Sequence, residues 1–154
     1  LGATPLGRPR LLAAKTAVVV AVELVQVAVL VPLALALGWD PEVAPLTVVG
    51  AIVLASIAFA GVALLMAGTL PGLVVLAAAN GIYVVLLLFG DLVIPLDELP
   101  SGVASVASLL PTAALAEILR AGFGDGSASG GAWAVLAAWA VGAPLLAARF
   151  FRWD

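Results

Sequence analysis

The sequence has 154 residues, of which 65% are hydrophobic and 10% are charged, and its mean hydropathy is +1.30. A soluble domain of this size could not bury so many apolar side chains, because small domains keep much of their surface in water. The absence of cysteine and histidine excludes disulfides, thiol nucleophiles, imidazole acid-base chemistry and the usual zinc sites. The composition therefore predicts an all-α membrane protein that crosses the bilayer several times.

Four apolar segments are long enough to cross a hydrocarbon core of ~30 Å as helices. We expect these spans at residues 16–38, 46–70, 73–90 and 132–150. Between the first two, "WDPEVAP" (39–45) combines prolines with carboxylates and predicts a water-facing loop. "TLPG" (69–72) predicts a tight turn, and the Gly- and Ser-rich residues 124–131 predict a flexible linker before the last span.

Small residues recur four apart in the second and fourth spans, a spacing that lets membrane helices approach closely. They are Ala51 and Ala55, Ser56 and Ala60, and Ala63 and Ala67 in the second span, and Ala134, Ala138 and Gly142 in the fourth. Pro144 predicts a kink in the fourth span.

Residues 101–123 could form a fifth crossing on length alone, so the distribution of charge has to decide. With four crossings, Arg8, Arg10, Lys15, Arg149 and Arg152 fall on one side and only Arg120 falls on the other. Because basic residues concentrate on the cytoplasmic side, this arrangement favours cytoplasmic termini. It also makes the formal net charge of −3 mainly a property of the outer face.

Pro111 supports the same interpretation because it divides this region into two short helices, near residues 101–110 and 112–121. Each would be only ~15 Å long, too short to span the membrane. We therefore expect four transmembrane spans plus an outer re-entrant helical hairpin. On its second helix, the spacing of Glu117 and Arg120 predicts a surface ion pair.

Three local motifs occur in an order that resembles the type 2 ABC transporter permeases. "TPLGRPRLLAAK" (4–15) is similar to the cytoplasmic segment that precedes a span in that family. "VIPLDELP" (93–100), followed by "SLLPTAALAEILR" (108–120), resembles its outer re-entrant segment, and "ARFFRWD" (148–154) resembles its basic tail. The resemblance extends over nearly the whole sequence.

This resemblance implies the membrane subunit of an ATP-driven exporter, which dimerises and pairs with a separate ATP-binding subunit. Family members typically have six spans, so residues 1–154 are expected to form a single transmembrane domain that lacks the first two. The second half of the dimer could be identical or different. No cofactor and no nucleic-acid partner is indicated, and the substrate stays open.

Candidate site residues follow from this interpretation. The Pro-interrupted segment "TPLGRPR" (4–10) is expected to be an exposed loop that contacts the ATP-binding subunit, although its basic residues could instead anchor the chain at lipid headgroups. The coupling candidates are Thr4, Pro5, Leu6, Arg8 and Arg10. The hairpin would close the outer end of the path, and the gate candidates are Pro95, Asp97, Pro100, Pro111 and Glu117.

Polar residues inside the expected spans are candidates for the lining of the translocation path. Glu23 and Gln26 share one helix face, and Asn80 lies near the middle of the third span. The alternative is structural, because a buried carboxyl or amide often only joins helices by a hydrogen bond.

No energy source is encoded in the chain. "LLAAKT" contains a Lys-Thr pair, but Pro9 and Ala14 occupy the positions at which a phosphate-binding loop needs glycine. ATP hydrolysis would therefore take place in a partner. An alternative of a different class is a non-transporting membrane scaffold or assembly factor, whereas an intramembrane enzyme lacks obvious catalytic groups.

Overall fold

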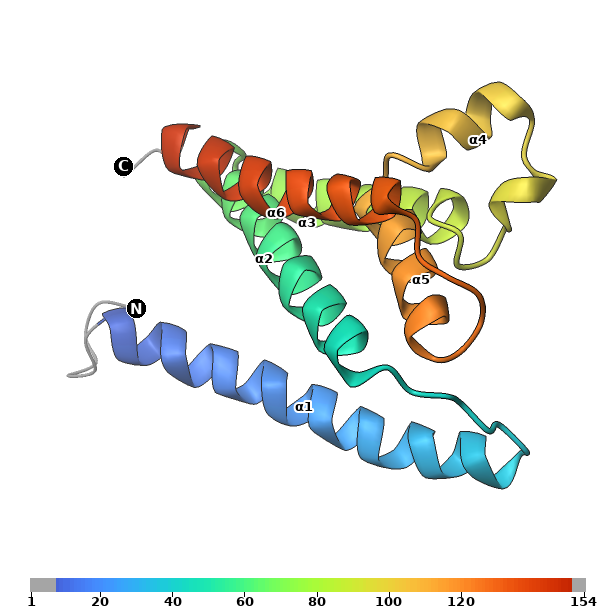
Figure 1. The fold of residues 1–154 in the computed structure, drawn as a ribbon. Coiled ribbons are helices and arrows are strands. Elements are labelled where there is room, and N and C mark those ends of the chain that lie inside the picture. The colour runs from blue at the N-terminus through green and yellow to red at the C-terminus, as the bar shows by residue number, and fades with distance from the viewer. Residues whose placement is uncertain (1–7, 151–154) are drawn as a thin grey trace. The chain divides into compact units, whose positions relative to one another are not determined.

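The computed structural model describes residues 8–150, and for residues 8–17, 19–20 and 23–24 it describes the backbone alone. Helices are the only regular secondary structure in this part of the chain, which confirms the predicted fold class (Figure 1). The helices are α1 (Arg8–Ala36), α2 (Pro45–Thr69), α3 (Gly72–Phe89), the short 3-10 helix η1 (Leu96–Glu98), α4 (Ser101–Ala107), α5 (Pro111–Gly122) and α6 (Gly130–Phe150). The chain divides into two compact units, residues 1–41 and 42–154.

The first unit consists of one long helix. α1 has 29 residues and is therefore ~43 Å long, enough to cross a bilayer. It begins at Arg8. Residues 8–10 are therefore helical, and the prediction of a loop over residues 4–10 is wrong for these three residues. Pro9 lies in the first helical turn, where its missing N–H would have no intrahelical partner and its fixed φ suits a helix.

The second unit contains three helices that are long and apolar enough to cross a membrane, namely α2, α3 and α6. Their bounds agree with the predicted spans to within two residues. Leu70 and Pro71 connect α2 to α3, which confirms the predicted tight turn. The predicted linker is shorter than expected, because Gly130 and Gly131 belong to α6.

The core of the second unit lies where α2, α5 and α6 meet (Figure 1). Its buried side chains are mostly alanines, packed around two large residues that are completely buried, Ile118 on α5 and Leu136 on α6. The members are Ala51, Ala55, Ala114, Ile118, Ala132 and Leu136. In lipid, small side chains hold helices together because they allow extended van der Waals contact between backbones.

α2 and α6 approach each other closely at Gly61. A Cβ atom added to Gly61 would lie 2.5 Å from both the Cδ and the main-chain nitrogen of Pro144. Gly61 therefore lets α2 pack directly against the backbone of α6 at the proline within that helix.

Only part of the predicted small-residue pattern takes part in this contact. Ala51 and Ala55 are buried as expected, but the other predicted pairs on α2 and the residues Ala134 and Ala138 on α6 are exposed. The buried face of α6 is instead formed by Ala132, Leu136, Ala140, Ala143 and Ala147. Ala-rich spans contain small-residue spacings on several faces, so spacing alone does not identify the face that packs.

Of the three membrane-length helices in the second unit, α3 is the least enclosed. Within its described range, Gly72–Phe89, no residue is buried, and large apolar side chains such as Leu73 and Leu76 are highly exposed. Its outer surface is therefore suited to contact lipid or other membrane helices.

Candidate functional site

The predicted pair of short helices is present, and its second member is built into the core. α4 has 7 residues and α5 has 12, so they are ~10 Å and ~18 Å long and neither spans a bilayer alone. Their axes are bent by 83°. Taken as one broken span, the pair would raise the number of membrane-length helices in the second unit from three to four.

α5 begins at Pro111, which is buried, and Leu110 is the residue before it. The sequence suggests why the break lies here, because a proline disfavours helical backbone at the preceding residue and fits the first helical turn. α5 packs against both α2 and α6 (Figure 1). Its buried residues are Pro111, Ala113, Ala114, Ala116, Ile118 and Gly122.

The N-terminal end of α5 contacts the C-terminal end of α3. The hydroxyl of Thr112 donates a hydrogen bond to the main-chain carbonyl of Leu86 over 3.4 Å. That carbonyl lies in the last turn of α3, where main-chain carbonyls lack an N–H partner within the helix. A Cβ atom added to Gly90 would lie 2.0 Å from the Thr112 hydroxyl oxygen. This contact therefore requires glycine at position 90.

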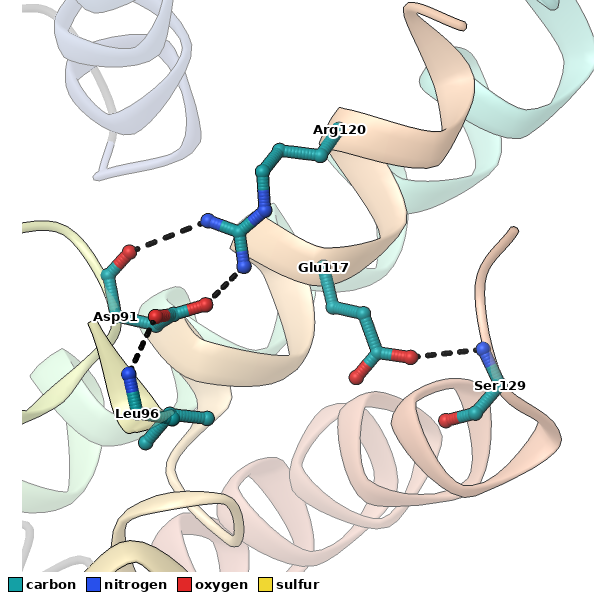
Figure 2. Close-up of polar contacts among 5 residues, drawn as sticks. All are labelled: Asp91, Leu96, Glu117, Arg120 and Ser129. Atoms are coloured by element: carbon teal, nitrogen blue, oxygen red, sulfur yellow. Dashed lines mark hydrogen bonds and ion pairs between the residues drawn. The ribbon is translucent and has the colours of Figure 1, made fainter. Parts of the chain in front are cut away.

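An ion pair makes a second connection between α5 and the end of α3 (Figure 2). The guanidinium of Arg120 binds the carboxylate of Asp91, and it also donates to the Asp91 main-chain carbonyl over 3.4 Å. The other carboxylate oxygen of Asp91 accepts the main-chain N–H of Leu96 at 3.0 Å. Asp91 has a φ of 60°, a conformation that few residues other than glycine, asparagine and aspartate adopt.

Glu117 makes a different connection, to the start of α6. Its carboxylate accepts the main-chain N–H of Ser129 at 2.8 Å (Figure 2). The hydroxyl of Ser129 in turn accepts the N–H of Ala132 at 3.1 Å, as expected of the residue that caps a helix N-terminus. The predicted pairing of Glu117 with Arg120 is therefore wrong, because each side chain is occupied by a partner on another segment.

Two further hydrogen bonds attach the helix pair to its neighbours. The indole N–H of Trp139 on α6 donates to the carbonyl of Leu109, in the turn between α4 and α5, at 2.9 Å. The N–H of Ala44, just before α2, donates to the carbonyl of Gly122 at 2.7 Å. α5 is thus connected to the ends of α2, α3 and α6.

The gate candidates divide into two groups in this arrangement. Pro95, Asp97 and Pro100 are exposed and lie in the segment that contains η1, whereas Pro111 is buried and Glu117 is half-buried on α5. The structure brings only the second group into the core. What role any of the five has in gating stays a prediction.

The other predicted site residues are less completely described. Thr4, Pro5 and Leu6 lie outside the described residues, and only the backbone of Arg8, Arg10 and Glu23 is described, as part of α1. Gln26 is exposed on α1. Asn80 is exposed on α3, where its amide donates to the carbonyl of Leu76 in the same helix at 3.0 Å.

Four side chains that organise this region were missing from the predicted site. They are Asp91, Thr112, Ser129 and Trp139. For Ser129, the sequence signal was available, because a serine before an apolar run is a common helix start. The partners of the other three are 26 to 30 residues away along the chain, and no local pattern indicates such contacts.

One comparison with known proteins identifies a family that the sequence matches. The sequence model of the family described as ABC-2 type transporter matches residues 2–123, well over half of the 154 residues. The match includes all of α5 and ends just before the linker to α6. No curated protein and no solved structure matches the chain.

Proposed function

The chain belongs to the ABC-2 type transporter family, and from this premise we propose that it forms one half of a dimeric exporter whose outer end is closed by α4 and α5. Family membership makes it a multi-pass membrane permease, not an enzyme, and implies an ATP-binding partner that hydrolyses ATP. It also favours transport over the alternative of a non-transporting scaffold.

The observation that carries the gate proposal is the attachment of α5 to three membrane-length helices. Thr112 and Arg120 bind the end of α3, Glu117 binds the start of α6, and Gly122 binds the segment before α2. A change in the relative positions of these helices would therefore shift α5. Such a shift is what a gate driven by the rest of the permease requires.

The sidedness of the gate is supported by charge. In the proposed orientation, residues 1–15 and the C-terminal segment lie in the cytoplasm with five of the six basic residues, in agreement with the positive-inside tendency. Seven of the nine acidic residues, in the loops, the turns and the helix pair, then lie outside. They are Asp40, Glu42, Asp91, Asp97, Glu98, Glu117 and Asp125.

We further propose that residues 4–10 contact the ATP-binding subunit and that Glu23, Gln26 and Asn80 contribute to the polar lining of the path. The exposure of Gln26 and Asn80 within apolar helices supports this assignment. A polar side chain at membrane depth is costly against lipid and usually faces a cavity or another protein segment.

The gate proposal can be tested by fixing α5 to α2. A Cβ atom at Gly122 would lie 2.8 Å from Cγ2 of Val48, so the double substitution Gly122→Cys and Val48→Cys should place two thiols within disulfide range. The chain has no other cysteine. The variant would be purified with its ATP-binding subunit, and ATPase activity and substrate-stimulated turnover would be measured before and after oxidation.

We expect oxidation to abolish coupled turnover and a reductant to restore it, since the lock stops α5 from moving relative to α2. The single substitution Val48→Cys is the matched control and should be insensitive to both treatments. Full turnover of the oxidised double variant, with the disulfide verified by mass spectrometry, would refute a moving gate at α5.

A further inference from the structure

A polar pocket and an apolar groove lie next to each other at the end of α3. The pocket has a volume of about 500 Å³ and is lined by charged side chains of Asp91, Asp97 and Arg120 together with Leu92. The groove has a volume of about 330 Å³ and also has Leu92 in its wall. Both volumes fall in the range of ~300–1,000 Å³ that is usual for ligand sites.

The groove follows α2 and α3 from this end into the membrane-spanning part of the molecule. On α3 its wall extends from Leu87 to Ala79, a distance of ~12 Å along the helix axis. On α2 it extends from Phe59 to Met66. Because its wall is almost entirely apolar, the groove is suited to a hydrocarbon chain and not to a polar solute.

The pocket lies at the level where lipid headgroups are expected. Asp91 follows the last residue of α3, Phe89, by only two positions, and α3 is an apolar helix of membrane length. A ligand that fills both spaces must therefore have a polar end at the membrane surface and an apolar end inside the bilayer.

The charges of the pocket define the polar end of that ligand more closely. Two of the five N–H donors of Arg120 bind Asp91, and the side chain is 45% exposed, so donors on its open side can bind a phosphate. Asp97 is exposed in the same pocket. Its carboxylate offers acceptors to a primary ammonium group, which has three N–H donors.

We propose that this pocket and groove bind one phospholipid with a phosphoethanolamine headgroup. Its phosphate lies against Arg120, its ammonium against Asp97, and one acyl chain between α2 and α3. An anionic glycerol headgroup gives Asp97 no cation, and a choline headgroup gives it no N–H donor. The charge pattern therefore selects phosphatidylethanolamine over phosphatidylglycerol and phosphatidylcholine of the same chain length.

The test uses the full chain, stripped of lipid in detergent. Phosphatidylethanolamine, phosphatidylcholine and phosphatidylglycerol with identical acyl chains are titrated separately, and binding is followed by the unfolding midpoint and by native mass spectrometry. Inorganic phosphate and ethanolamine are titrated in parallel as headgroup fragments. We expect saturable binding of one phosphatidylethanolamine per chain, about fivefold tighter than phosphatidylglycerol, and no shift with either fragment.

Two pairs of variants locate the site. Asp97→Asn should remove the preference for phosphatidylethanolamine, whereas Glu98→Gln, a change at the neighbouring exposed acid outside the pocket, should preserve it. Ala79→Phe fills the groove and should weaken binding of every lipid. Ala77→Phe, at another exposed alanine of α3 that does not line the groove, should not.

Four results would overturn the assignment. Equal affinity for the three lipids, or an unchanged preference in Asp97→Asn, would show that the charged pocket does not select the headgroup. Binding of inorganic phosphate as tight as that of the lipid would indicate a small-anion site. Loss of lipid binding as protein concentration rises would indicate that a second copy of the chain covers the groove.

Discussion

Arg120 on α5 binds Asp91, which follows the end of α3, through both the carboxylate and the main-chain carbonyl of Asp91. The Arg120 side chain is 45% exposed, and that of Asp91 is 9% exposed. Solvent therefore screens one partner, and the ion pair should contribute less than a fully buried one. Its main role is then to hold the αL turn at Asp91 and the segment toward Leu96 against α5.

The first prediction concerns the coupling between these two residues. Asp91→Asn and Arg120→Gln should each lower the free energy of unfolding by ~1 kcal/mol, and the double variant should lose little more than the worse single variant. Asparagine is chosen because it tolerates the αL backbone of position 91. Unfolding in detergent measures all three, with Glu98→Gln as a control at an exposed acid. Fully additive losses would show that the pair does not interact.

The second prediction concerns the contact between α2 and α6. Gly61→Ala should destabilise the chain by ~2 kcal/mol, because a new methyl group would overlap the backbone of α6. The atoms it would meet, Cδ and N of Pro144, lie 2.5 Å from the added Cβ position, and a proline ring within a helix cannot move aside alone.

The matched control for this prediction is Gly81→Ala on α3. No atom outside its own helix lies within 4 Å of a Cβ added there, so the change should be neutral or stabilise the helix by up to ~1 kcal/mol. Unfolding midpoints of the two variants, measured side by side, give the comparison. Equal stability of both would contradict the packing of α2 on α6 through Gly61.

Much of the fold could be predicted from the sequence because membrane helices are specified by local composition. The bounds of α2, α3 and α6 follow from apolar length, and the break before α5 follows from Pro111. What could not be predicted is the face that packs. Ala134 and Ala138 have the right spacing and are exposed, whereas Leu136 between them is completely buried, because the position of α5 selects that face.

The candidate site shows the same limit. The sequence placed Glu117 and Arg120 three residues apart on one helix, and the local rule for such a spacing predicted an ion pair. In the structure, both side chains instead bind groups brought close by tertiary packing, Ser129 and Asp91. A polar side chain can bind a main-chain N–H or a charged side chain that is distant in the sequence. The spacing of residues along one helix does not indicate such partners.

The third prediction concerns the start of α6. Ser129→Ala should cost ~1 kcal/mol because it removes the hydroxyl that accepts the N–H of Ala132. Ser129→Asn should restore most of the loss, because it keeps an acceptor without adding a charge beside the Glu117 carboxylate. Ser127→Ala, at an exposed serine two residues earlier, is the control and should have no measurable effect. Equal unfolding midpoints for Ser129→Ala and the unmodified chain would show that this cap does not stabilise α6.

The fourth prediction concerns coupling to the ATP-binding subunit. Replacing residues 4–10 by a Gly/Ser segment should leave membrane insertion intact but separate ATP hydrolysis from transport, because the proposed contact would be lost. ATPase activity and turnover of the co-purified complex measure the effect. An equivalent replacement of residues 40–43, in the loop between α1 and α2, is the control and should stay coupled. Normal coupling after the first replacement would refute the proposed contact.

The fifth prediction decides whether α4 and α5 form a re-entrant hairpin or one broken span. The chain has no cysteine, so single cysteines can be labelled in intact cells by a reagent that does not cross membranes. In the proposed topology, Asp40→Cys and Glu98→Cys should react from outside, and Thr69→Cys only after permeabilisation. All three positions are exposed.

The deciding position is Ser127, in the linker between α5 and α6. A re-entrant pair returns the chain to the side on which it entered, so Ser127→Cys should react from outside, as Glu98→Cys does. A broken span would carry Ser127 to the side of Thr69 and would also place Arg149 outside, against the positive-inside tendency. Protection of Ser127→Cys in intact cells, with Glu98→Cys reactive, would therefore show that α4 and α5 form a fifth crossing and not an outer gate.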